Sequence, residues 1–197
     1  MGLPINKIIV ATNKNDILDR VFKTGIYKSS SVSKTLSPSM DIQVASNFER
    51  LLFDLLNNDA NEVCKLMNKL SRKGSFEVDK ILISQISKDF SSGAVTDKDT
   101  VATINQFFNA RGITLCPHSA IGVKVAQHLV KGEETVISLG TAHPAKFKET
   151  VESALGKTIP VPLALKDLMK KQESVKVICP DTELVADEIR SSYLRAN

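Results

Sequence analysis

The sequence predicts an α/β protein with a mostly parallel sheet and flanking helices. Short apolar runs, such as residues 7–12 and 134–139, alternate with longer segments of helical periodicity. With 197 residues, 42% of them hydrophobic, the chain is long enough to bury a sizeable core. No internal repeat interrupts the alternation, so strands and helices are expected to follow one another in turn.

The first expected strand covers residues 7–12, and the polar turn after it carries Asn13, Asn15 and Asp16. Asp16 is expected to cap the next helix, because a side-chain oxygen there accepts hydrogen bonds from free amides. Open α/β sheets also bind ligands at the carboxyl ends of their strands. Asn13 and Asn15 are therefore candidates for substrate contact as well as for the turn.

Helical signals dominate the middle of the chain. Ser46, followed by Glu49 three residues later, predicts a capping box with Ser46 as the cap. Apolar residues then recur at helical spacing, and Gly74 is placed to end a second helix over residues 59–73. The next expected elements are a short strand at 76–78, a helix at 79–90, a loop at 91–93 and a helix at 96–111 that ends at Gly112.

The last third of the chain begins with a short strand at 113–115 and continues with a helix at 117–131, a buried strand at 134–139 and a helix at 144–155. Beyond the proline-rich linker at 160–162, the pattern indicates a short helix to about residue 171, then a strand or extended segment at 174–178, and a helix at 182–194. We expect one main domain over residues 1–158, with residues 159–197 as a helical and extended appendage of it.

Composition excludes several classes of function. The net charge is +4, from 26 basic and 22 acidic residues mixed along the chain, with no tryptophan. Scattered basic residues without aromatic neighbours do not indicate a nucleic-acid partner. No run reaches the roughly 18 apolar residues that span a bilayer, and the N-terminus lacks signal-peptide features, so no membrane association is expected.

Cysteine and histidine do not form a ligand set. The three cysteines are odd in number and widely spaced, which fits neither disulfides nor zinc and predicts reduced thiols in the cytoplasm. They are Cys64, Cys116 and Cys179. His118 and His143 each stand beside a proline near a helix start, which is typical of structural roles, and no metal site is expected.

Polar side chains gather in two further segments. Thr141 follows the expected strand at 134–139 and precedes Pro144, so its hydroxyl either faces a ligand or caps the next helix. The second segment, which surrounds the helix that starts near residue 46, supplies donors suited to a substrate that carries a phosphate and a carboxylate. Its candidates for substrate contact are Ser37, Ser39, Asp41, Asn47 and Arg50. The planar guanidinium of Arg50 is suited to bind an oxyanion through two hydrogen bonds, but Arg50 could also form an ion pair with Glu49 or Asp54.

Five segments, in the same order and at similar spacing, resemble threonine synthases of the longer, fungal and bacterial type. They are residues 11–16, 35–42, 46–50, 117–122 and 138–147, and the resemblance covers about residues 1–155. It implies a fold-type-II enzyme that binds pyridoxal 5'-phosphate between two α/β domains and converts O-phosphohomoserine and water to threonine and phosphate. Thr141 matches the residue whose hydroxyl faces the cofactor's pyridine nitrogen. Cys116 departs from the acidic residue that many members carry there.

The family's Schiff-base lysine and the glycine- and asparagine-rich loop for the cofactor phosphate have no counterpart in this chain. Lys124 and Lys146 fit solvated helix positions. By resemblance, the chain is a C-terminal portion that holds no catalytic residue and is inactive alone, and its partner is the N-terminal portion of the enzyme. An exposed apolar face is then expected where that portion packs. The alternative is a non-catalytic α/β module that binds a phosphorylated metabolite or a partner chain.

Overall fold

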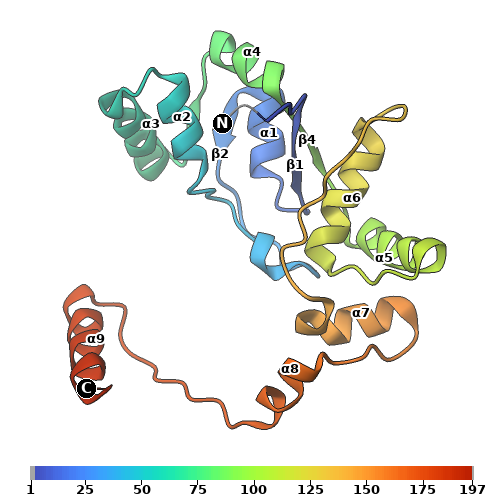
Figure 1. The fold of residues 1–197 in the computed structure, drawn as a ribbon. Helices are drawn as coiled ribbons and strands as arrows, with labels where there is room; N and C mark the ends of the chain where they lie inside the picture. The colour runs from blue at the N-terminus through green and yellow to red at the C-terminus, as the bar shows by residue number, and fades with distance from the viewer. Residues whose placement is uncertain (1–2, 197) are drawn as a thin grey trace. The chain divides into compact units, whose positions relative to one another are not determined.

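The computed structural model describes residues 3–196. The chain divides into two units, Met1–Pro160 and Val161–Asn197. At the centre of the first unit, β1 (Ile8–Thr12) pairs in parallel with β4 (Phe90–Ala94). This strand pair lies between α1 (Ile17–Thr24) and α6 (Pro117–Leu129) (Figure 1). The expected combination of parallel strands and flanking helices is confirmed.

Strand β4 occupies the residues for which a loop was expected, and that prediction is wrong. Ser91, Ser92 and Gly93 signal a loop locally, but Ser92 and Gly93 fit this strand through tertiary partners. The Ser92 hydroxyl donates to Asp19 of α1 at 2.8 Å. A Cβ on Gly93 would lie 2.8 Å from Cγ1 of Val125, so glycine lets α6 pack closely on the sheet.

A second, antiparallel pair forms from β2 (Ile26–Lys28), which the sequence did not predict, and β3 (Ser75–Glu77). Tyr27 holds this strand pair against the core. Its buried ring stacks on the rings of Phe48 and Phe76, with centroid distances of 5.3 Å and 4.9 Å. Its phenol oxygen accepts a hydrogen bond from the Ala45 amide at 2.7 Å. Residues of α1 and of the helices α2 (Phe48–Leu55), α3 (Ala60–Lys73) and α4 (Lys80–Asp89) join this pair in one apolar core.

Helix ends follow the sequence signals in some places and not in others. Gly74 and Gly112, which close α3 and α5 (Asp97–Arg111), adopt the left-handed conformation expected of them. The prediction that Ser46 caps α2 is wrong, because the helix begins after Asn47 and no side chain forms a capping hydrogen bond there. Asp16 precedes α1 without capping it, because its carboxylate pairs instead with Arg20 at 2.8 Å.

Two expected strands do not form within the described residues. Residues 113–115 are an irregular link between α5 and α6, and Leu115 packs on a small cluster around Ile104. Residues 134–139 are extended and exposed, with 84% of Ile137 accessible. A strand needs a neighbour for its amides and carbonyls, and none of the described residues pairs with this segment. The helix expected at 144–155 is split into η2 (Pro144–Phe147) and α7 (Lys148–Leu155).

The second unit is largely exposed. It contains α8 (Leu163–Lys166), η3 (Leu168–Lys170) and α9 (Thr182–Ala196). Residues 174–178 are extended without strand pairing, which is one of the two expected forms. Lys176 forms an ion pair with Glu188 of α9, which ties this extended segment to the last helix.

Candidate functional site

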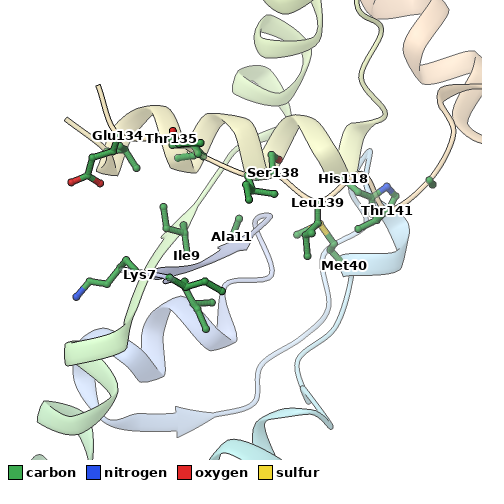
Figure 2. A pocket seen from close by; sticks show the side chains of 18 of the residues that line it. Lys7, Ile9, Ala11, Met40, His118, Glu134, Thr135, Ser138, Leu139 and Thr141 are labelled. Atoms are coloured by element: carbon green, nitrogen blue, oxygen red, sulfur yellow. The ribbon is translucent and has the colours of Figure 1, made fainter. Parts of the chain in front are cut away.

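A cavity of about 1010 Å³ lies in the first unit. Its walls come from β1, η1 (Pro38–Met40), α6 and the extended residues 134–142. In Figure 2, Met40, His118 and Thr141 gather at one end of the cavity, while Lys7 and Glu134 lie toward the other. Ile9 and Ala11 of β1 form part of the apolar lining between the two ends.

Beside this cavity, a buried polar network joins the end of β1 to the loop at residues 33–41. The Asn13 amide donates to the hydroxyl of Thr35 at 2.8 Å, to the hydroxyl of Ser37 at 2.9 Å and to Oδ1 of Asp41 at 2.8 Å. The Asn15 amide donates to the same Asp41 oxygen at 2.9 Å. The sequence analysis proposed four of these five residues as substrate contacts, and the structure brings them together.

Asp41 is the centre of this network. Its carboxylate accepts four hydrogen bonds, from the Asn13 and Asn15 amides and from the hydroxyl and the backbone amide of Thr35. Burial alone would raise the pKa of Asp41, but these hydrogen bonds outweigh it and lower the pKa below its usual value. The carboxylate is therefore ionised at neutral pH and holds the loop against the end of β1.

The network uses most of the hydrogen-bonding capacity of its members. The Asn15 side chain also exchanges two hydrogen bonds with the backbone of Ser33, and the Asn13 side-chain oxygen accepts a hydrogen bond from the backbone N–H of Asn15. Side chains that satisfy one another have few donors left for a ligand. The geometry thus assigns Asn13, Asn15, Ser37 and Asp41 a role in fixing the loop, and substrate contact by them stays a prediction.

The other three substrate candidates lie elsewhere. Ser39 is exposed and lines the cavity at η1. Asn47 and Arg50 are exposed at the start of α2 and do not line this cavity. Among the residues that the structure describes, Arg50 forms no ion pair, so neither Glu49 nor Asp54 holds it.

Thr141 is exposed and lines the cavity. The alternative role considered for it, a cap on the turn that follows, is filled by another residue. His143 precedes η2, and its Nδ1 accepts a hydrogen bond from the Ala145 amide at 3.1 Å. Thr141 therefore stands at the cavity with its hydroxyl not engaged as a helix cap.

Two lysines line the cavity. The Lys7 ammonium donates at 2.9 Å to the carbonyls of Ser87 and Lys88 at the end of α4, which accounts for its position. Lys146 is exposed on η2 and lies over the Phe147 ring at 5.7 Å. Neither environment is a buried, desolvated one of the kind that activates a lysine amine.

Cys116 has a defined role at the start of α6. It is buried, and its sulfur accepts a hydrogen bond from the Ser119 amide at 3.4 Å, so it caps the helix. An acidic side chain would cap the helix in the same way, because a carboxylate readily accepts hydrogen bonds from free backbone amides. The departure from the family pattern therefore preserves the cap.

Thr35 and His118 are the residues whose importance the sequence analysis missed. Thr35 lies inside one of the five matching segments, which was the available signal, but only the fold places it against Asp41. His118 was assigned a structural role from its position beside Pro117. Both of its ring nitrogens are buried, and no hydrogen-bond partner for them exists among the described residues.

Within residues 3–196, no group of three or more histidine, cysteine or acidic side chains is arranged to hold a metal ion. In the same part of the chain, no helix is both long enough and apolar enough to cross a membrane.

The fold and the site define an α/β protein with parallel strands and a ligand-sized cavity beside the end of a strand. Residues 119–189 match the family described as "Threonine synthase, C-terminal". The chain is related to the threonine synthases, as the five segments indicated. It spans about two fifths of the length of the curated relatives that it matches.

Three relatives illustrate the match. Threonine synthase of Pseudomonas aeruginosa is 41% identical over 90% of this chain and 38% of its own length. The Saccharomyces cerevisiae enzyme is 40% identical, covering 99% of this chain and 43% of its own. The crystal structure of PLP-bound threonine synthase from Brucella melitensis superposes with a TM-score of 0.87 at 44% identity, over 97% of this chain and 41% of that one.

Proposed function

We propose that this chain supplies the C-terminal part of a pyridoxal-phosphate-dependent threonine synthase, which converts O-phosphohomoserine and water to threonine and phosphate. The observation that carries the proposal is Thr141, whose hydroxyl lines the cavity while His143 serves as the turn's cap. The relatives are named threonine synthase, and one of their structures is PLP-bound. A cytoplasmic location belongs to the same proposal, supported by three free thiols.

The residues at the cavity fit this cofactor. A hydroxyl is a suitable donor to a pyridine nitrogen, and the apolar lining from β1 and α6 suits the faces of a planar ring. Pyridoxal phosphate, when bound, supplies an electron sink for carbanion chemistry. A neutral hydroxyl at the ring nitrogen does not force protonation there, as a carboxylate would, so Thr141 would moderate that sink.

The remaining parts of the site are assigned to the rest of the enzyme. Because neither cavity lysine lies in an activating environment, we expect the Schiff-base lysine outside this chain, on the N-terminal portion that would be its partner. The loop fixed by Asp41 then presents Ser39 and Met40 to the cavity, and contact with the phosphate-bearing substrate is proposed for Ser39.

The test combines this chain with the N-terminal part of a related threonine synthase. We expect cofactor absorbance in the visible region and release of phosphate from O-phosphohomoserine. Thr141→Val keeps the shape but removes the hydroxyl, and should lower turnover about tenfold, while Thr141→Ser retains it. A combination that yields neither absorbance nor phosphate would favour the non-catalytic binding module instead.

A further inference from the structure

His118 is partly buried, and both nitrogens of its imidazole are buried and unsatisfied. It is the second residue of α6, and its ring packs on Phe147 with centroids 4.6 Å apart. Neither Nδ1 nor Nε2 has a hydrogen-bond partner among the described residues. Buried polar atoms are nearly always bonded, so each exception calls for a physical explanation. The side chain lines the cavity that also contains Thr141, which suggests that a ligand supplies the partner (Figure 2).

The charges around the ring determine what kind of ligand it accepts. Burial lowers the pKa of His118, the positive charge of Lys146 lowers it further, and Asp41 acts in the opposite direction. The imidazole is therefore neutral at pH 7, with one N–H to donate. The Asp41 carboxylate is already engaged by four hydrogen bonds, whereas Lys146 is exposed at the cavity. A donor beside an exposed cation suits an anionic oxygen.

We propose that His118, with Lys146 beside it, binds a phosphate oxygen of the ligand that occupies this cavity. The Thr141 and Ser39 hydroxyls on the same lining provide further donors for such a group. That the anion is a phosphate monoester rests on the proposed function. That His118 receives an anion rests on its unpartnered ring nitrogens, its place in the cavity lining and the Lys146 charge in the same lining. The ester could be that of the cofactor or that of the substrate, and the two share this chemistry.

The chain offers a direct test, because it contains three histidines. Each ring can be followed by proton NMR, assigned by changing His118, His128 and His143 to Gln one at a time. Inorganic phosphate, compared with chloride at equal ionic strength, should raise the pKa of His118 by about one unit or more, since an adjacent anion favours the charged ring. His128, exposed at the far end of α6, is the matched control. An unchanged His118, or equal shifts at all three rings, would overturn the proposal.

A second measurement identifies the ester. Broadening of the phosphate 31P signal by the chain should disappear in His118→Phe, which keeps the packing on Phe147, and persist in His128→Gln. Pyridoxal phosphate and O-phosphohomoserine are then added separately. Displacement of phosphate by the first assigns the contact to the cofactor, and displacement by the second assigns it to the substrate. If neither ester displaces phosphate, the assignment to a phosphate monoester is wrong.

The experiments distinguish a failure of the threonine synthase proposal from a failure of the His118 contact. If the His118 shift appears but the combined enzyme releases no phosphate, the anion contact stands and the threonine synthase assignment falls. If the combined enzyme is active and the His118 pKa does not respond to phosphate, only the His118 contact falls.

Discussion

The loop at residues 33–41 and the extended segment at residues 134–142 both border the cavity, but only the loop is held by hydrogen bonds within the described residues. Around the loop, Asp41 and Asn13 bind Thr35 and one another through short hydrogen bonds that this chain supplies itself. The extended segment forms no strand, and its apolar side chains such as Leu139 are exposed. One wall of the site is therefore held by hydrogen bonds that this chain supplies itself, whereas the described residues supply no strand pairing for the other wall.

Among the polar contacts around the cavity, the largest effect on stability is expected from breaking the Asp41 network. In Asp41→Asn, one of the two oxygens that accept hydrogen bonds becomes an amide nitrogen that faces a donor. Hydrogen bonds to a charged group contribute about 1.5–3 kcal/mol, so we expect the free energy of unfolding to fall by about 2–3 kcal/mol in urea titrations. Asp54→Asn, on the exposed face of α2, is the control and should be near neutral. Equal effects from both variants would mean that the network does not hold the loop.

The same network predicts a dependence on pH. Because the folded-state pKa of Asp41 is lowered, the carboxylate contributes stability above its unfolded pKa, near the ordinary value of 3.8. That contribution is lost as the pH falls through the folded pKa. The difference in unfolding free energy between the wild-type chain and Asp41→Asn should therefore shrink below about pH 4. A difference that stays constant from pH 7 to pH 3 would show that the carboxylate's charge is not what the variant removes.

A smaller effect is expected at Cys116, which caps the helix that carries His118. Cys116→Ala removes the cap and should lower the free energy of unfolding by about 1 kcal/mol, while Cys116→Ser should retain most of it, since serine is a strong cap. Cys64→Ala on exposed α3 controls for loss of a thiol. If the alanine and serine variants at Cys116 unfold alike, the sulfur contributes by packing rather than by capping.

Sequence reasoning worked where local signals agree with tertiary structure. The β1 strand and the left-handed glycines after α3 and α5 follow from pattern and backbone chemistry. It failed where a distant partner decides the outcome. Ser91 to Gly93 form a strand because Asp19 and Val125 accommodate them, and residues 134–139 do not, because no described strand pairs with them.

The candidate site was predicted to a similar degree. Four network residues and Thr141 were named in advance, because polar groups after a strand, together with the five matching segments, mark them. What the sequence could not show is how their bonds are distributed. Asn13 and Asp41 bond to each other and to Thr35, whereas the ring nitrogens of His118 have no partner within the described residues. Whether a buried polar atom has a hydrogen-bond partner depends on how the side chains pack, and a single sequence does not reveal that packing.

The smallest effect on the free energy of unfolding is expected in the extended segment. It tests most directly whether this segment is held less firmly than the loop at residues 33–41. Leu139→Ser replaces a side chain that is 78% exposed, so the free energy of unfolding should change by less than about 0.5 kcal/mol. Ile121→Ala, buried in α6, should cost about 2–5 kcal/mol. Hydrogen exchange should likewise be fast at residues 134–142 and slow at the Thr35 backbone amide, which donates to Asp41 at 2.9 Å. If Leu139→Ser were as costly as Ile121→Ala, this segment would belong to the core, and both walls of the cavity would be complete in this chain alone.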